Sequence, residues 1–247
     1  MKTGSGRDEE PTLSSFVESI REYVEHEKDN GRMEMQVSPE TVAELGSMPR
    51  AERSLTDIAD EIAQCTQCGL HESRTRTVPG QGNTAPEIMF IGEGPGADED
   101  RQGLAFVGRA GKLLTQMITA MGLNRDDVFI GNVVKCRPPD NRPPLPDEMS
   151  KCMPYLREQI AVLKPKVIVA LGGTAVKGLL SVETGIIRIR GKWLSFEGVP
   201  TMPTFHPAYL LRNQSAKKDA WVDLQEVLKR LGRTTPPREI KGKTAQH

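Results

Sequence analysis

Long apolar runs and a secretory leader are both missing from this 247-residue sequence. No stretch of about 18 consecutive apolar residues is present, which predicts that no segment crosses a membrane. Residues 1–10 lack the charged segment followed by an apolar segment that marks a secretory signal. We therefore expect a protein of the cytoplasm, where thiols stay reduced and free to bind metal.

Cysteine is scarce, and the few that occur are grouped. The sequence has four, Cys65, Cys68, Cys136 and Cys152. The first two form a C-x2-C pair, and the last two bracket a proline-rich loop. Four thiolates suit either zinc or an iron–sulfur cluster. Structural zinc sites usually take both halves from one compact module, whereas here an α/β unit lies between the halves. This favours a [4Fe-4S] cluster, with zinc and unrelated buried thiols as the alternatives.

A surplus of charge of either sign is also missing, but the balance hides an asymmetry. Residues 1–50 have 6 Lys and Arg against 11 Asp and Glu, and residues 51–247 have 27 against 22. The first segment is therefore acidic and the second mildly basic. A basic body can bind a polyanion, although an excess this small is also typical of an ordinary solvated surface. The positions of the basic residues must decide between the two.

Unbroken apolar runs alternate with helical patterns from residue 55 onward, in a chain with enough hydrophobic content for one core. Such runs favour an α/β fold with a parallel sheet covered by helices on both faces. The expected strands are 88–91, 128–134 and 167–171, followed by two short ones at 186–189 and 201–205. The expected helices include one through Cys65, one opened by Gly172 and Gly173, and others at 110–121, 146–163 and 217–231.

The same pattern divides the chain into three segments. Residues 1–50 read as an acidic, linker-like extension with one possible amphipathic helix, residues 51–233 as the folded domain, and residues 234–247 as a flexible tail. The helix would place Phe16, Ile20, Tyr23 and Val24 on one face. That apolar face must be buried either on a partner protein or on the domain itself, and we expect a partner.

Three polar features are expected at the carboxyl end of the sheet, where ligands bind in open α/β sheets: two follow expected strands and one lies within the second. They are the glycine-rich turn 92–96, Asn132 and His206. The turn lacks both the Lys-Ser/Thr pair of a P-loop and the full spacing of a dinucleotide site. A single histidine such as His206 is more often structural than functional. Together, however, the three features predict a polar set in one cleft, which favours a functional site.

Four motifs resemble those of the iron–sulfur (family 4) uracil-DNA glycosylases. They are GEGPGADED at 92–100 with GLAFVGRAG at 103–111, GNVVKCRPP at 131–139, FHPAYLLRN at 205–213, and the cysteines in their order and spacing. The resemblance runs from about residue 55 to about residue 231. It implies a three-layer α/β/α sandwich with a central, mostly parallel four-stranded sheet. It also implies a [4Fe-4S] cluster held by the four cysteines. We favour a structural role for this cluster, with a redox role as the alternative.

The activity that the resemblance implies is hydrolysis of the N-glycosidic bond of uracil in DNA, which leaves an abasic site. An extruded uracil would stack on Phe106, and the amide of Asn132 would pair with its O4 and N3–H. Glu99 would crowd C5 and so reject the methyl group of thymine. Gly94 stands where other uracil glycosylases have an aspartate, so only its backbone can contact the base.

Two residues would carry the chemistry. His206 would donate to uracil O2 and stabilise the departing anion. Glu93 would orient or deprotonate the attacking water and favour the cationic sugar. The alternative for Glu93 is a carboxylate that only caps the following turn.

Contacts to DNA are expected after the His-Pro turn and on the loop between the third and fourth cysteines. Leu210 and Leu211 would form an apolar wedge that fills the gap left by the extruded base. Phosphate and backbone contacts are expected from a further set, Lys135, Arg137, Arg142, Pro207 and Arg212.

Two other interpretations stay open. One is a different lesion specificity, such as hypoxanthine, although the relatives with that activity tend to lack an acid at the position of Glu93. The other is a non-catalytic iron–sulfur DNA-binding module. A related group that crosslinks to DNA carries a histidine-ended insert, which this sequence lacks, because residues 137–146 contain no histidine. For a glycosylase we expect a monomer, associated with the nucleoid, that acts on uracil-containing DNA.

Overall fold

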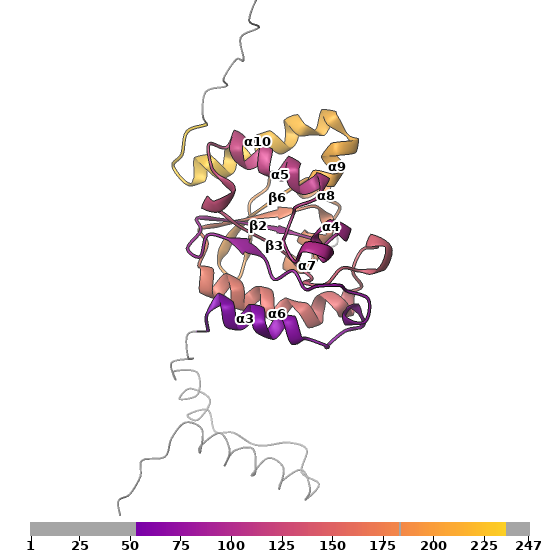
Figure 1. The fold of residues 1–247 in the computed structure, drawn as a ribbon. Coiled ribbons are helices and arrows are strands. Elements are labelled where there is room, and N and C mark those ends of the chain that lie inside the picture. The colour runs from indigo at the N-terminus through magenta and orange to yellow at the C-terminus, as the bar shows by residue number, and fades with distance from the viewer. Residues whose placement is uncertain (1–52, 183, 236–247) are drawn as a thin grey trace, which may run out of the picture. The chain divides into compact units, whose positions relative to one another are not determined.

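The computed structural model describes residues 53–182 and 184–235, drawn in colour in Figure 1. The predicted extension over 1–50 and most of the predicted tail over 234–247 lie outside these ranges. The helices are α3 (Leu55–Gln64), α4 (Ala97–Gln102), α5 (Arg109–Ala120), α6 (Pro146–Leu163), α7 (Gly173–Leu180), α8 (Ile186–Ile189), α9 (Pro207–Arg212) and α10 (Lys217–Arg230). The strands are β1 (Gln81–Gly82), β2 (Ile88–Gly92), β3 (Phe129–Asn132), β4 (Val167–Leu171), β5 (Leu194–Phe196) and β6 (Val199–Thr204).

The strands form one sheet in the order β1-β3-β2-β4-β6-β5. The four central strands, β3, β2, β4 and β6, run parallel. The edge strands β1 and β5 are antiparallel to their neighbours and only two and three residues long. The predicted α/β class and its parallel central strands are confirmed, and the two short edge strands are an addition.

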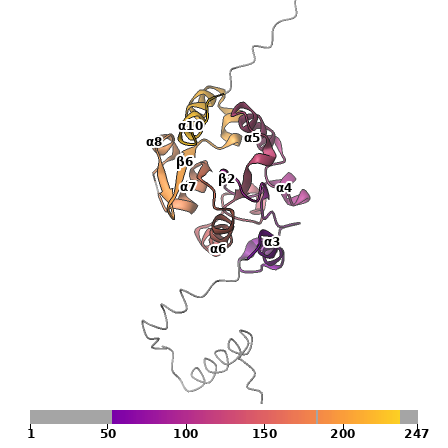
Figure 2. The ribbon, with the colours of Figure 1, turned by 90° about the vertical axis from the view of Figure 1, so that its left-hand side faces the viewer.

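Helices cover both faces of the sheet, because side chains alternate along each strand between two cores. Met89 and Ile91 of β2 pack on the side of α6 and α7, whereas Ile88 and Phe90 pack on the side of α5 and α10. Figure 2 shows this layering, with α6 and α3 on one side of β2 and α5 and α10 on the other. The unbroken apolar runs of the sequence therefore reflect strands that are buried on both faces.

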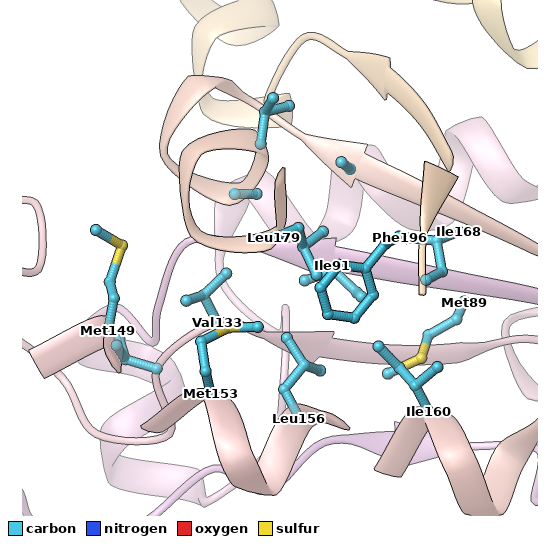
Figure 3. Packing of buried hydrophobic residues seen from close by; sticks show 14 of the residues in the cluster. Met89, Ile91, Val133, Met149, Met153, Leu156, Ile160, Ile168, Leu179 and Phe196 are labelled. Carbon is cyan, nitrogen blue, oxygen red and sulfur yellow. The ribbon is translucent and has the colours of Figure 1, made fainter. Parts of the chain in front are cut away.

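Helix α6 supplies much of the first core. Figure 3 shows three of its side chains, those of Met153, Leu156 and Ile160, turned toward Met89 and Ile91 of β2, and Met149 belongs to the same core. Full burial of a side chain of this kind stabilises the fold by about 1.5–3 kcal/mol. Pro146 opens the helix at a position where its missing N–H is not needed, and Glu148 accepts the backbone N–H of Leu145 at 2.7 Å. The predicted bounds, 146–163, are confirmed.

The prediction of a strand at 186–189 is wrong, because these residues form the short helix α8. The isoleucines favour a strand by propensity. The three-residue spacing of Ile186 and Ile189 instead lets both pack inward, while Ile187 and Arg188 stay exposed. Tertiary packing thus decides the conformation. In the described ranges, every helix is too short or too polar to cross a bilayer.

Candidate functional site: a polar cavity at the strand ends and a cysteine cage

A cavity of about 520 Å³ lies at the carboxyl ends of β2, β3 and β6. The structure brings together there all the residues proposed for catalysis and base recognition: Glu93, Gly94, Glu99, Phe106, Asn132 and His206. Arg142 and Arg212 also line it. Residues more than 100 positions apart in the sequence meet because the parallel strands end at one edge of the sheet.

Asn132, the last residue of β3, is buried with 1% of its surface exposed. Its Oδ1 is fully buried, and no group in the described part of the chain hydrogen-bonds to it. An orphaned buried carbonyl is unusual and points to a missing partner. Gly92 makes room for this amide, because a Cβ there would lie 2.5 Å from both Asn132 Oδ1 and Phe106 Cζ. The amide and the ring therefore close over the end of β2.

Phe106 has a backbone φ of +52°, which is uncommon for a bulky residue. The surrounding chain holds it there. The Glu99 carboxylate accepts backbone N–H groups of Val107 and Gly108 at 2.9 and 2.8 Å. Gly111 permits α5 to pack on the Phe106 carbonyl, since a Cβ there would lie 1.8 Å from its oxygen. Strain of this kind persists only when the surroundings determine it, and it is common at functional sites.

His206 caps α9, and its geometry fixes which ring nitrogen carries the proton. Its Nδ1 accepts the backbone N–H of Ala208 at 3.1 Å, so the hydrogen of the neutral ring must sit on Nε2. Burial, with a smaller contribution from the positive charge of Arg212, lowers the pKa of His206 to about 4. The imidazole is therefore neutral at physiological pH and acts as an Nε2–H donor. The centre of its ring lies 5.7 Å from that of Phe106.

The two acidic residues of the cavity differ in their partners. Glu99 binds the N–H groups described above and also accepts that of Gly96 at 3.1 Å, so it caps α4. Within the described residues, no hydrogen bond or ion pair engages the side chain of Glu93. The capping role that was the alternative for Glu93 thus belongs to Glu99. The Glu93 carboxylate is left available to a ligand or to water.

The residues expected at DNA divide into exposed and buried sets. Arg212 is exposed, and Arg137 is half-buried with its Nε bonded to Asn141 Oδ1 at 2.8 Å. Pro207 is buried at the first position of α9 and presets the turn after His206. Leu210 is only 1% exposed and packs in a core with Leu113 and Phe205, so it is not available as a wedge.

The expectation that Lys135 belongs to an exposed basic loop is wrong. Its side chain is 1% exposed, and its ammonium donates to Asn132 O at 2.9 Å and to Gln159 Oε1 at 2.7 Å. Burial lowers the pKa of Lys135 to about 8, and the neighbouring Cys152 opposes that shift. The loop keeps Arg142, which forms a two-pronged pair with Glu148 at 2.8 and 2.6 Å.

All four cysteines line a second cavity, which we call the cysteine cage. Cys65 and Cys68 follow α3, Cys136 follows β3, and Cys152 lies on α6. Arg74 Nη1 donates to Cys136 Sγ at 3.2 Å, and the Lys135 backbone N–H donates to Cys152 Sγ at 3.3 Å. Burial raises the pKa of both thiols, to about 11 for Cys152. Three basic residues, Arg74, Lys135 and Lys151, border the cage.

This donor set fits an iron–sulfur cluster. Four sulfurs surround one cavity, and N–H groups point at two of them, as is usual around cluster thiolates. Thiolates are ligands of zinc as well, so the four sulfurs are compatible with either group.

Three residues of these sites escaped sequence reasoning, and each acts through a distant partner. Arg74 reaches Cys136, 62 positions away, and Gln159 reaches Lys135, 24 positions away. Arg125 donates to the Ala105 carbonyl, 20 positions away, beside the strained Phe106. Of the three, only Arg74 could have been expected from the sequence, because a cluster of cysteine thiolates is usually stabilised by a nearby cation.

Comparison with known proteins identifies the family. Residues 79–226 match the Uracil DNA glycosylase superfamily. The chain is 48% identical to a type-4 uracil-DNA glycosylase of Thermotoga maritima over 64% of this chain and 83% of that protein. It is 44% identical to one from Archaeoglobus fulgidus over 74% of this chain and 96% of that protein. A type-5 uracil-DNA glycosylase of Pyrobaculum aerophilum is 31% identical over 63% of this chain and 75% of that protein. The chain therefore belongs to the uracil-DNA glycosylase superfamily and, within it, to the type-4 enzymes.

Proposed function

We propose that the cavity at the ends of β2, β3 and β6 receives a uracil flipped out of DNA. The protein is a DNA repair glycosylase: it hydrolyses the N-glycosidic bond of uracil, releases the free base and leaves an abasic site. The observation that carries the assignment to this cavity is the buried, unpartnered Oδ1 of Asn132. A base with an N–H donor at the right edge would satisfy it.

Asn132 reads the base. Its Oδ1 accepts N3–H of uracil and its amide nitrogen donates to O4, whereas cytosine offers the reverse pattern and leaves two groups unpaired. Phe106 provides the stacking face, and the Gly94 backbone borders the base. Glu99 contributes by holding the Phe106 loop and by crowding C5, where thymine has its methyl group. A purely steric rejection is worth about 1–3 kcal/mol, so the rigidity of this loop matters.

His206 stabilises the leaving group. As the bond between C1′ and N1 breaks, the electron pair moves onto uracil and negative charge collects at O2. A neutral imidazole with its proton on Nε2 donates to that oxygen, and the Ala208 N–H on Nδ1 supports this tautomer.

Glu93 handles the nucleophile. Its carboxylate orients a water molecule toward C1′ and takes one proton from it as the new C–O bond forms. The proton later passes to the uracil anion through solvent, which balances the reaction. The negative charge of Glu93 also favours the cationic sugar of the transition state. The absence of a structural partner for this side chain among the described residues supports the role.

Arg212 and Arg137 are proposed to hold phosphates, and Pro207 to fix the turn that presents α9 to DNA. Because Leu210 is buried, the wedge proposal passes to Leu211, which is only partly buried beside it. The wedge would occupy the space that uracil leaves in the duplex.

The cysteine cage is proposed to hold a [4Fe-4S] cluster through Cys65, Cys68, Cys136 and Cys152. When bound, the cluster would tie the end of α3 to β3 and α6 and so stabilise the domain. The N–H donors on Cys136 and Cys152 support thiolate ligands at these positions.

We further propose a monomer that acts in the cytoplasm at the nucleoid. Residues 51–233 would form the glycosylase domain, and residues 1–50 would form an extension that a partner protein binds through the apolar face described above.

The test uses oligonucleotides that differ in one base. Purified protein should release the base from a uracil-containing strand and leave abasic sites there, and it should release almost no base from hypoxanthine, xanthine and thymine strands. Cleavage of hypoxanthine at the rate of uracil would instead support the alternative lesion specificity. Protein prepared without oxygen should be brown and carry about four irons per chain, and stoichiometric zinc would overturn the cluster assignment.

A further inference from the structure

Lys135 is a buried cation with no carboxylate partner among residues 53–182 and 184–235. Lysine is rarely buried unless its charge is compensated, because removing an ammonium from water is costly. Its ammonium bonds to two neutral oxygens, the Asn132 carbonyl and Gln159 Oε1. No carboxylate in the described ranges pairs with it. Gln159 is itself 2% exposed and anchored by a bond from Nε2 to Pro79 O at 2.8 Å. The ammonium is thus held in a fixed position.

A metal-loaded cysteine cage would supply the compensating charge. Lys135 lines the cage, its backbone N–H donates to Cys152 Sγ, and Cys136 is the next residue. Thiolates that bind metal are negatively charged. Arg74 approaches Cys136 with its guanidinium, and Lys135 adds a second cation. The side chain therefore sits between a source of negative charge and the end of β3.

The same side chain reaches the base-reading residue. Lys135 donates to the backbone carbonyl of Asn132, whose amide stands in the cavity. Past Asn132 the chain continues along β2, with Val133 N–H bonded to Gly92 O at 3.0 Å and Val134 N–H bonded to Glu93 O at 3.2 Å. Lys135 folds back across this turn. Its bond is a direct link between the cage and the residue that reads uracil.

We propose that Lys135 is a positioning residue that couples the loaded cysteine cage to uracil recognition by fixing the backbone of Asn132. The proposal rests on the proposed function, because it assumes a cluster in the cage and uracil in the cavity. The negative charge of the cage holds the ammonium in place, and the ammonium holds the Asn132 carbonyl. Loss of either end should loosen the other.

The first test is Lys135→Met, which keeps the length of the side chain and removes its charge. Lys151→Met is the matched control, because Lys151 also borders the cage but its side chain is half-exposed. Its Nζ lies 3.8 Å from Asp147 Oδ2, so its charge already has a carboxylate partner. Removing a group that orients a functional side chain typically costs about 10- to 100-fold. We expect that loss in the single-turnover rate on uracil, with DNA affinity within about threefold of wild type. The ratio of uracil to cytosine cleavage should fall, and Lys151→Met should match wild type in all three.

A second measurement does not depend on catalysis. Coupling between two sites is reciprocal, so free uracil should help the protein retain iron against a chelator. Wild type and Lys151→Met should show this protection, and Lys135→Met should lose it. Wild-type protein that lacks iron or does not bind uracil would reject the proposed function instead, so the two failures are distinguishable. The coupling would be overturned if uracil still protected the iron of Lys135→Met, or if Lys135→Met had the rate and base preference of wild type.

Lys135→Met can destabilise the core, so circular dichroism and iron content are measured first. If Lys135→Met does not fold, Gln159→Met is used to test the proposal. This variant keeps Lys135 and removes one of the two oxygen atoms that bind its ammonium. We then expect a several-fold loss of rate and weaker protection of iron by uracil. Wild-type values for both in Gln159→Met would overturn the proposal.

Discussion

The guanidinium of Arg125 donates a hydrogen bond to the carbonyl oxygen of Ala105, the residue before Phe106. Its other terminal nitrogen donates to Thr115 Oγ1 at 3.1 Å, so Arg125 joins α5 to the start of the strained loop. Glu99 holds the other end of the loop at Val107 and Gly108. A positive φ at a residue such as Phe106 costs about 1–3 kcal/mol, and these bonds offset that cost.

Replacing Arg125 should therefore disturb base stacking. We expect Arg125→Met to lower the free energy of unfolding by about 1–3 kcal/mol and to reduce the single-turnover rate about tenfold, because Phe106 can then relax. Arg101→Met is the control, since that side chain is 68% exposed on α4. Urea unfolding and rapid-quench kinetics measure the two effects. A variant that loses stability but keeps the wild-type rate would show that Phe106 does not need this anchor.

Asn132→Asp should change base preference. The amide nitrogen that donates to uracil O4 becomes a carboxylate oxygen, which can accept from the amino group of cytosine. We expect uracil excision to fall at least about a hundredfold and the preference to move toward cytosine. Asn132→Leu is the companion variant, because it removes both polar groups and should lose uracil without any gain on cytosine. Equal rates for wild type and Asn132→Asp on both bases would remove Asn132 from the site.

The depressed pKa of His206 predicts a pH dependence with a defined sign. Its folded-state pKa is about 4, against about 6.5 in the unfolded chain. Between these values the unfolded state binds a proton that the folded state does not. Stability should therefore fall as the pH falls from about 6.5 toward about 4. His206→Asn lacks this contribution, so unfolding at several pH values should show wild type losing stability relative to the variant on acidification.

The same assignment bears on the rate. The neutral ring is the proposed donor, so the acid limb that His206 contributes to the single-turnover profile should lie near pH 4 and not near 6.5. His206→Ala and Glu93→Ala should each slow cleavage at least about a hundredfold at neutral pH while DNA affinity stays within a few-fold. Nearly full activity in Glu93→Ala would mean that backbone groups position the water.

The residues that sequence reasoning misjudged share a physical cause. The apolar runs at 88–91 and 167–171 correctly predict buried strands, because a strand that is covered on both faces of the sheet has apolar side chains at every position. The segment 186–189 is also rich in isoleucine, but it contains Arg188, and the packing of Ile186 and Ile189 on the apolar clusters makes it a helix. Lys135, next to Cys136 and two positions before Arg137, is predicted from the sequence to be a surface cation, but Gln159 of α6 binds its ammonium in the interior. Local composition predicts elements well, but side-chain direction is set by partners far along the chain.

The acidic character of residues 1–50 leads to a prediction about the whole chain. Their negative charge should repel phosphates weakly, and more so at low salt, where screening is weak. Deleting them should leave cluster content and activity essentially intact and should tighten DNA binding at low ionic strength. Melting temperature and salt-dependent affinity of the truncated and full chains measure this. A fall in melting temperature of more than about 5 °C would instead mean that these residues contribute to the stability of the domain.

Neighbouring leucines on α9 should behave in opposite ways. Leu210 packs in a core with Leu113 and Phe205, so Leu210→Ala should lower the free energy of unfolding by about 2–5 kcal/mol. Any loss of activity that follows should be the same on duplex and single-stranded DNA. Leu211 is partly buried and is the proposed wedge, so Leu211→Ala should fold normally and lose activity mainly on duplex DNA. In single-stranded DNA uracil leaves no gap in a duplex, so the wedge should contribute little to the rate. We expect Leu211→Ala to cleave uracil in duplex DNA about tenfold more slowly than wild type, with single-stranded cleavage within about twofold. Equal losses on both substrates would assign Leu211 to the packing of α9, and the gap left by uracil would then be filled by another residue.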